Sequence, residues 1–292
     1  MTEGILPASI IVVSYNKRPY TRLCLQSLLR GDPRPAQIVV IDNGSQDGTV
    51  EMIEDEFSAQ AREAGVECVL IRNGANLGAC TARNQGLEVA SGEYIGFMDN
   101  DVAVRSRGWL GLLAEVLEED PAHGIVGPKL VFPFEPWTIQ HAGAAISRTG
   151  RVKYLGRGAP IDAPEHNVRR QVQCLISACW LMRAAVPAQI GGLDEVFNPA
   201  QFEDFDFCYR AREARWLVLY DPRAEMYHYE SVTTDGSPDV NYKYITIRNG
   251  MEFKRRWRHV FEREDGPPDE QCRWLGLETR AIEQTGIPPI TD

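Results

Sequence analysis

Short runs of β-branched residues alternate with segments of helical periodicity through the first third of the chain. The apolar runs begin near Ala8, Gln37, Val66 and Tyr94, about 29 residues apart. The helical segments between them cover residues 19–30, 49–64 and 79–90. A glycine lies just beyond each helical segment, where helices commonly end. We therefore predict βαβ units and a mixed, mainly parallel sheet flanked by helices.

Beyond residue 101 the periodicity is weaker. The elements expected there are helices over 109–119, 203–215 and 242–261, and strands over 124–130, 174–182 and 216–220. Residues 132–170 are rich in glycine, proline and arginine, which predicts hairpins and loops. We expect one domain over residues 1–261, followed by a polar, proline-punctuated tail, 262–292, that is loosely ordered.

The composition favours a globular protein without a membrane span. The chain has 292 residues and 43% hydrophobic content, so it can bury a large core, as one domain or as two closely joined halves. Its longest apolar runs are too short to span a membrane, and we identify no signal peptide. The seven cysteines form no C-x-x-C pair, which favours reduced thiols in the cytoplasm over disulfides or a zinc site.

The net charge of −10 argues against a dedicated nucleic-acid binder, because phosphate contacts need a concentrated basic surface. An acidic protein that binds a diphosphate must also supply positive charge locally. A divalent cation is the simplest source of that charge.

Three polar residues, Asp99, Asn100 and Asp101, directly follow the fourth predicted strand. In parallel α/β sheets, ligands bind beyond the carboxyl ends of the strands. Asp99 and Asp101 project to the same side of extended backbone, so both carboxylates can approach one hard cation. The alternative is a simple turn, because Asp and Asn also dominate turns. The position at a strand end favours the metal site.

The ends of the first two strands carry further candidates. Asp42 could accept a hydrogen bond from a ribose hydroxyl or a base N–H, whereas Ser45 and Asp47 are favoured as caps of the next helix. Ser14 and Tyr15 follow the first strand, where a nicotinamide dehydrogenase would have G-x-G-x-x-G. The chain also has no G-x-x-x-x-G-K phosphate loop.

Two helix starts offer an anion site and a general base. Gly78 precedes a helix whose free N–H groups, together with Arg83, could face an anion, although a surface arginine is the common alternative. Glu203 and Asp204 open another helix, where acids favour the macrodipole and could also supply a general base. His228, taken alone, is an ordinary half-buried histidine.

Ten segments, in order over about residues 8–261, resemble the inverting family-two nucleotide-sugar glycosyltransferases with the GT-A fold. They read IVVSYN at 11–16, VIDNGS at 40–45, NLG at 76–78, ARN at 82–84, SGEY at 91–94, DND at 99–101, GGLDE at 191–195, EDFD at 203–206, YH at 227–228 and RN at 248–249. Each segment alone is a weak signal, and the ordered set is a strong one. The chain is most similar to the bacterial rhamnosyltransferase-like group that decorates cell-surface glycans.

The resemblance implies a role for each matching residue. The candidate donor-binding residues are Ser14, Tyr15, Asp42, Gly78, Arg83, Asp99 and Asn100, and the resemblance places Tyr15 and Asp42 at the nucleobase. The implied ligands of Mn²⁺ or Mg²⁺ are Asp99, Asp101 and His228. The resemblance makes Asp204 the catalytic base, and Glu203 beside it is a candidate to bind the acceptor. The donor would occupy a half at about residues 8–104, and the acceptor a half at about 105–261.

The implied activity is transfer of a single sugar from a nucleoside-diphosphate sugar to an acceptor hydroxyl, with inversion, in surface glycan or glycoconjugate biosynthesis. The acceptor would be a saccharide, a glycoconjugate or a lipid-linked sugar. The chain lacks the membrane segment and the Gln-x-x-Arg-Trp signature of processive members. We expect a cytoplasmic enzyme, with peripheral membrane contact through the basic residues 254–258 as a hypothesis.

Two points stay open at the level of sequence. Trp180 is a candidate stacking platform for an acceptor sugar, with core packing as the favoured alternative. A nucleotidyltransferase-like enzyme and a non-catalytic nucleotide-sugar-binding partner are the alternative functions. A nucleotidyltransferase would turn over triphosphates, and a lapsed enzyme would have no physical reason to keep Asp99, Asp101, Asp204 and His228 together.

Overall fold

The computed structural model describes residues 4–230, 232 and 241–292. These residues form one ten-stranded sheet and one two-stranded sheet. The strands of the large sheet are β1 (Ile5–Ser14), β2 (Arg34–Asp42), β3 (Glu67–Arg72), β4 (Tyr94–Asp99), β5 (Val102–Val104), β6 (His123–Val131), β7 (Ile139–His141), β10 (Arg170–Gln171), β11 (Cys179–Arg183) and β12 (Leu217–His228). The two-stranded sheet contains β8 (Ala144–Ile146) and β9 (Val152–Tyr154).

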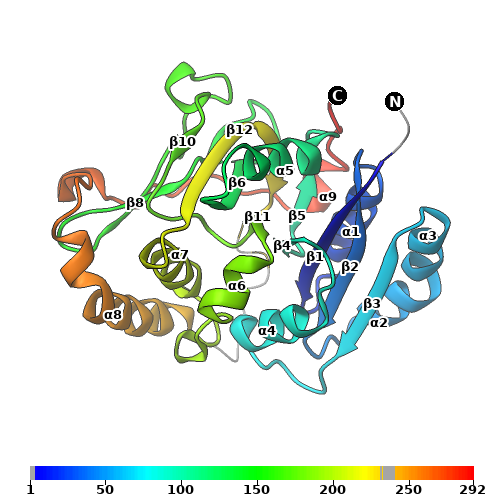
Figure 1. The fold of residues 1–292 in the computed structure, drawn as a ribbon. Helices are drawn as coiled ribbons and strands as arrows, with labels where there is room; N and C mark the ends of the chain where they lie inside the picture. The colour runs from blue at the N-terminus through cyan, green and yellow to red at the C-terminus, as the bar shows by residue number, and fades with distance from the viewer. Residues whose placement is uncertain (1–3, 231, 233–240) are drawn as a thin grey trace.

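The large sheet is mixed and mainly parallel. Its order is β10-β12-β6-β11-β4-β1-β2-β3, with β5 paired to β12 and β7 paired to β6 (Figure 1). The four strands of the first third, β3, β2, β1 and β4, are all parallel, as the βαβ rhythm predicts. Antiparallel β11 joins this half to β6 and β12, which are parallel to each other. The predicted fold class is confirmed.

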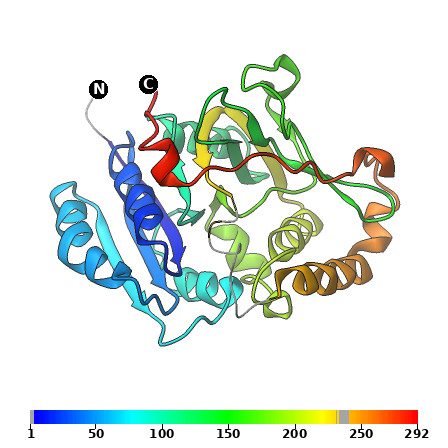
Figure 2. The same ribbon diagram turned by 180° about the vertical axis from the view of Figure 1, so that it is seen from behind.

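Helices cover both faces of the sheet (Figures 1 and 2). The α-helices are α1 (Arg18–Leu29), α2 (Thr49–Met52), α3 (Ser58–Glu63), α4 (Ala79–Val89), α5 (Trp109–Glu119), α6 (Ala185–Ile190), α7 (Glu203–Glu213), α8 (Tyr242–Phe261) and α9 (Ile282–Thr285). Short 3₁₀ turns occupy Pro164–His166, Glu195–Phe197 and Asp269–Gln271. The predicted helices 109–119 and 242–261 have the same bounds in the structure.

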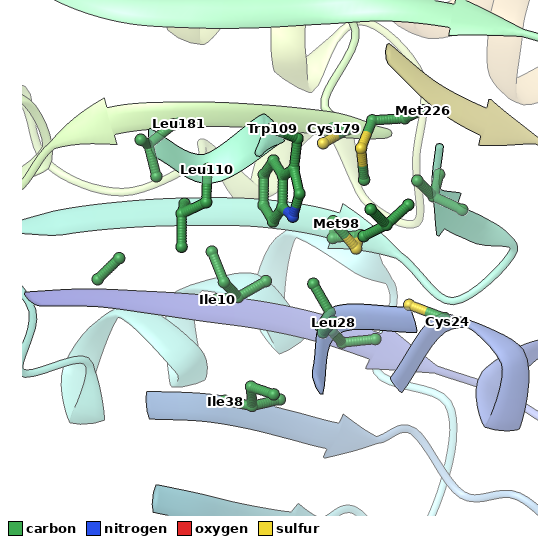
Figure 3. Close-up of a cluster of buried hydrophobic side chains, with 14 of the residues drawn as sticks. Ile10, Cys24, Leu28, Ile38, Met98, Trp109, Leu110, Cys179, Leu181 and Met226 are labelled. Atoms are coloured by element: carbon green, nitrogen blue, oxygen red, sulfur yellow. The ribbon is translucent and has the colours of Figure 1, made fainter. Parts of the chain in front are cut away.

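Alternate residues of the central strands face two separate cores. Ile10 of β1 packs on the side of α1 and α5, and Ile11 packs on the side of α4 and α7. Figure 3 shows the first core, where Trp109 of α5 gathers with Ile10 and with Met98 of β4. Because both faces of each strand are covered, the strands read as continuous apolar runs rather than alternating ones.

Three sequence predictions of element bounds need correction. The helix expected over 49–64 contains a π-helical turn, Ile53–Phe57, between α2 and α3. The strand expected to end at 220 continues to His228, because the pairing of β12 with β6 shifts register between Asp221 and Glu225 and resumes. The strand expected from 174 begins only at Cys179.

The C-terminal tail, expected to be loosely ordered, instead packs across the molecule. Figure 2 shows it running from the end of α8 back to α9, which lies beside α1. The backbone N–H of Ile282 donates to the Tyr20 hydroxyl at 3.1 Å. Thr291 pairs with Ser106 in a short parallel bridge. The prediction of a loosely ordered tail rested on its polar composition. It was wrong because hydrogen bonds of the backbone, rather than an apolar face, hold this segment in place.

Candidate active site

The carboxyl ends of β1 and β4 open into one cavity of about 800 Å³. The starts of α4 and α7, the end of β12, strand β9, the start of α8 and the tail segment 271–275 also contribute to its wall. The cavity therefore lies beyond the carboxyl ends of the parallel strands, where the topology predicts a ligand.

Asp99, Asp101 and His228 come together on this wall. Each offers one ligand atom, and the three atoms lie within 4.8 Å of one another. Strand pairing explains the meeting, because β5 follows Asp101 directly and pairs Val102 with His228 of β12. Asp101 Oδ1 lies 3.3 Å from His228 Nε2. Burial lowers the pKa of His228, but the Asp101 carboxylate outweighs burial and the net pKa is raised.

These three side chains fit a hard divalent cation. Two carboxylates and an imidazole are ligands that Mn²⁺ and Mg²⁺ accept. Gln140 lies behind the imidazole, 2.7 Å from His228 Nδ1 to its Oε1. When His228 Nδ1 donates to Gln140, Nε2 is left to face the carboxylates. Gln140 was not identified from the sequence, because no local pattern signals a residue that contacts a ligand from behind.

Arg83 is buried between two acids of the site. Its guanidinium lies 2.5 Å from Asp99 Oδ1 and 3.2 Å from Glu203 Oε1. The arginine lines the cavity, but its charge is already shared by these carboxylates. Burial raises the pKa of both Asp99 and Glu203, and the nearby arginine only partly opposes that shift. Glu203 Oε2 has no hydrogen-bond partner among the described residues.

Asp204 is half-buried at the start of α7 and lines the cavity. Its Oδ1 accepts from the Phe205 backbone N–H at 2.8 Å, and its Oδ2 accepts from the Ser177 N–H at 3.3 Å. Burial and the neighbouring Glu203 carboxylate raise the pKa of Asp204 to about 8. A carboxylate with that pKa is basic enough to accept a proton near neutral pH.

Asp206, two residues further along α7, is fully buried and outside the cavity wall. It pairs with Arg210 at 2.8 Å, as the i,i+4 spacing predicts. It also contacts Arg256 at 3.4 Å and accepts from Trp257 Nε1 at 2.9 Å. Asp206 therefore anchors α7 to α8, and Trp257 of the basic segment 254–258 belongs to the core rather than to the surface.

The residues at the ends of β1 and β2 separate into two groups. Tyr15 lines the cavity. Ser14 and Asp42 are buried and do not line it. The Ser14 and Thr21 hydroxyls lie 2.9 Å apart, so Ser14 helps hold α1. Asp42 Oδ2 accepts from the backbone of the following turn, while its buried Oδ1 has no partner among the described residues.

Gly78 and Asn100 both line the cavity. Gly78 has φ +85°, and a Cβ there would collide with Asn198 Oδ1. The same oxygen accepts from the Cys80 N–H at 3.1 Å, so Asn198 already uses part of the free start of α4. Asn100 donates to the Thr21 hydroxyl at 2.9 Å, which fixes the loop between the two aspartates.

Trp180, considered above as an acceptor platform, does not line the cavity and has no exposed surface. Its ring packs between Phe97, with centroids 5.6 Å apart, and Phe207, at 5.8 Å. That assignment is corrected, because a fully buried indole cannot stack on a ligand. Two of the aromatic residues that do line the cavity, Tyr154 and Trp274, lie in segments predicted only as loops and tail.

The family of the chain follows from comparison with known proteins. Residues 9–187, more than half of the chain, match the model of "Glycosyl transferase family 2". The chain belongs to glycosyl transferase family 2. The matched region includes the strand ends that carry Tyr15, Asp42 and Asp99 to Asp101.

Relatives of this family 2 chain include two bacterial proteins that align over most of it. It is 28% identical to the uncharacterized protein y4gI of Sinorhizobium fredii, over 88% of this chain but only 28% of that protein's length. It is 29% identical to the N-acetylglucosaminyl-diphospho-decaprenol L-rhamnosyltransferase of Mycobacterium tuberculosis, over 82% of this chain and 80% of the relative.

Solved structures share the fold at low sequence identity. GalNAc-T7, solved with UDP, GalNAc and Mn²⁺, superposes with a TM-score of 0.69 at 15% identity, over 87% of this chain and 49% of that chain. The mannosyltransferase PcManGT from Pyrobaculum calidifontis, solved with GDP-Man and Mn²⁺, superposes with a TM-score of 0.59 at 16% identity. The match covers 91% of this chain and 67% of that chain. At these sequence identities, the structural similarity supports only the fold of this family 2 chain and not its function.

Proposed function

We propose that this chain catalyses metal-dependent, inverting transfer of one sugar from a nucleoside-diphosphate sugar to an acceptor hydroxyl. The observation that carries the proposal is that Asp99, Asp101 and His228 share one cavity with Asp204. A cation site next to a carboxylate with a raised pKa is what displacement of a charged leaving group by a hydroxyl requires.

On the donor side, Asp99, Asp101 and His228 would hold Mn²⁺ or Mg²⁺. A bound cation would stabilise the negative charge that develops on the departing diphosphate. Solved structures of two proteins with this fold contain Mn²⁺ together with a nucleotide or a nucleotide sugar, which supports the assignment. Tyr15 and Gly78, on the cavity wall, would contact the donor. Asp42, which the resemblance places at the nucleobase, is buried and does not line the cavity, so it is not included among the donor contacts.

On the acceptor side, Asp204 would take the proton of the attacking hydroxyl. The acceptor oxygen forms its bond to the anomeric carbon as the bond to the diphosphate breaks, and the proton passes to a carboxylate oxygen of Asp204. Attack from the face opposite the leaving group inverts the anomeric centre in one displacement. Glu203 pairs with Arg83 through Oε1 and helps raise the pKa of Asp204. Its Oε2, which has no partner among the described residues, would bind the acceptor.

A lipid-linked acceptor at a membrane surface is part of the proposal. The M. tuberculosis relative is named for a diphospho-decaprenol acceptor. On α8, the exposed side chains of Tyr244, Ile247 and Met251 continue at helical spacing into exposed Arg255 and Arg258. Such an apolar and basic stripe suits peripheral contact with anionic lipids. No helix among residues 4–230, 232 and 241–292 is long and apolar enough to cross a membrane.

Flotation with anionic liposomes tests the membrane contact. We expect the wild-type chain to float at low salt and Met251→Asp to remain at the bottom of the gradient. Asp162→Ala, which alters an exposed side chain away from α8 and the cavity, is the control. If the wild-type chain does not float, the stripe is only a solvated helix face.

Calorimetry with nucleoside diphosphates and their sugars tests the central proposal. We expect binding in Mn²⁺ or Mg²⁺ that is lost in EDTA, and a bound donor at a hundred times its dissociation constant should stabilise the fold by about 2.7 kcal/mol. Asp101→Ala should lose the metal-dependent affinity with its fold intact, and Asp162→Ala should keep it. Equal diphosphate affinity in EDTA and in Mn²⁺ would refute metal-dependent donor binding.

A further inference from the structure

The tail segment Gln271–Leu275 forms one wall of the cavity rather than a separate surface. Gln271 accepts from the Lys153 ammonium at 2.8 Å, which ties the tail to β9. The Leu275 carbonyl accepts from Arg157 Nε at 2.8 Å. The side chain of Leu275 also lies against Gly158. These contacts fix the segment at both of its ends.

Trp274 lies between these anchors with an exposed fraction of 65%. The Arg157 guanidinium carbon lies 4.0 Å from the centroid of its ring. Arg157 is itself almost fully buried and pairs with Glu230 through two hydrogen bonds of 2.8 and 2.9 Å. The cation is therefore held in place, and it orders the indole from one face by a cation–π contact. Most of the indole surface remains exposed, and Trp274 lines the cavity.

The indole also adjoins the candidate base. Tyr154 packs edge-on against Trp274, with centroids 5.5 Å apart, and edge-on against Phe205, at 6.4 Å. Phe205 is the residue after Asp204, whose carboxylate faces the same cavity. One aromatic ring thus separates Trp274 from the start of α7. A ligand that rests on Trp274 lies on the Asp204 side of the cavity.

We propose that Trp274 is the platform on which the sugar ring of the acceptor stacks, so that the C-terminal segment 271–275 builds the acceptor subsite. A pyranose presents a face of C–H groups that suits the electron-rich face of an indole, while its hydroxyls stay available for solvent and polar side chains. A large, ordered and half-exposed aromatic ring in a cavity wall is the usual means of fixing such a ligand. The assignment rests on the proposed function, because it takes Asp204 as the base that the acceptor hydroxyl must reach.

Saturation-transfer NMR on the full chain tests this subsite without knowledge of the natural acceptor. The probes are the methyl glycosides of glucose, galactose, mannose, N-acetylglucosamine, N-acetylgalactosamine and rhamnose. We expect at least one probe to receive saturation from the wild-type chain. Trp274→Ala should weaken its binding by about tenfold, which corresponds to about 1.4 kcal/mol. Trp274→Phe, which keeps an aromatic face, should retain most of the binding.

Trp137→Ala is the matched control. Trp137 is also a partly exposed indole beneath a guanidinium, that of Arg105 at 5.0 Å, but it does not line the cavity. This variant should bind the probe like the wild type. The proposal is overturned if no glycoside receives saturation, or if Trp274→Ala binds the probe as well as Trp137→Ala does.

Nucleoside-diphosphate binding, measured by calorimetry on the same variants, separates the two proposals. Trp274→Ala should bind the diphosphate with wild-type affinity, because the indole lies outside the candidate metal site. If the wild-type chain binds glycosides but no diphosphate, the proposed function fails and the sugar subsite stands. If it binds diphosphate but no glycoside, the subsite fails and the donor site stands.

Discussion

Replacing Asp204 by Asn should stop catalysis and stabilise the folded protein at alkaline pH. The structure raises the pKa of Asp204 from its ordinary value near 3.8 to about 8, through burial and the Glu203 carboxylate. Between these values the folded protein holds a proton that the unfolded chain releases. The free energy of unfolding of the wild type therefore falls as pH rises through this interval. The Asp204→Asn variant has no such dependence, because its amide side chain does not titrate.

The size of the stabilisation follows from the same pKa values. Each pH unit between them corresponds to about 1.4 kcal/mol, so the whole interval sets an upper bound of about 6 kcal/mol. Asp204 is half-buried, and Glu203 shares the effect, so solvent screening reduces the expected gain to about 2 kcal/mol. For a chain of this size that gain is about 3 °C in Tm. The asparagine oxygen can keep the 2.8 Å bond from the Phe205 N–H and gives up only the longer one from Ser177.

Thermal unfolding between pH 5 and 9, without metal or donor, measures the stability, and kcat/KM over the same range measures the activity. Wild-type kcat/KM should rise with pH up to about 8, because the base must be ionised. Asp204→Asn should lose about 10²–10⁴-fold in kcat with donor affinity little changed. Asp206→Asn, on the same helix, should instead destabilise by about 3 kcal/mol, because it breaks a buried pair with Arg210. An Asp204→Asn variant that melts below the wild type at pH 9, or that keeps wild-type turnover, refutes the reasoning.

Three further substitutions test the surroundings of the base and the donor. Glu203→Gln should move the kcat/KM profile to lower pH, because it removes the carboxylate that helps raise the pKa of Asp204; an unmoved profile contradicts this. Gly78→Ala should cost at least about 1 kcal/mol in denaturant unfolding, since φ is +85° and the new Cβ meets Asn198 Oδ1. Asn249→Asp should cost about 2 kcal/mol or more, because its amide donates to three backbone carbonyls before α7 that a carboxylate would repel; equal urea midpoints would exclude that role.

The first half of the fold could be predicted from the sequence because its signals are local. Each strand of the parallel half is an apolar run, and each helix is followed by glycine. The second half could not be predicted as well, because β12 continues through Pro222 by a register shift that only its pairing with β6 reveals. The tail has no apolar periodicity, and its hydrogen bonds go to residues almost the whole chain away, such as Tyr20.

The candidate site divides in the same way. Asp99 and Asp101 are evident from sequence because they end a predicted strand. His228 joins them only through the pairing of β5 with β12, and the family resemblance supplied it before the structure did. Trp180 and Trp274 show one limit of prediction from sequence. Whether an indole packs in a core or faces a cavity depends on which other elements pack over it. For these two residues, the hydrophobic periodicity of the sequence does not predict those elements.

The acidic composition of the chain has a local counterpart that explains how it could bind a diphosphate. Asp99, Asp101, Glu203 and Asp204 line one cavity, in which Arg83 pairs with Asp99 and Glu203, and His228 lies beside Asp101. The pKa values of Asp99, Glu203 and Asp204 are all raised, because burial is not fully compensated by those partners. A cavity with this deficit of positive charge attracts a divalent cation more strongly than a neutral cavity would. The same deficit keeps Asp204 basic on the acceptor side. Excess negative charge therefore serves both halves of the proposed reaction: it attracts the cation that a diphosphate requires, and it raises the proton affinity of the base.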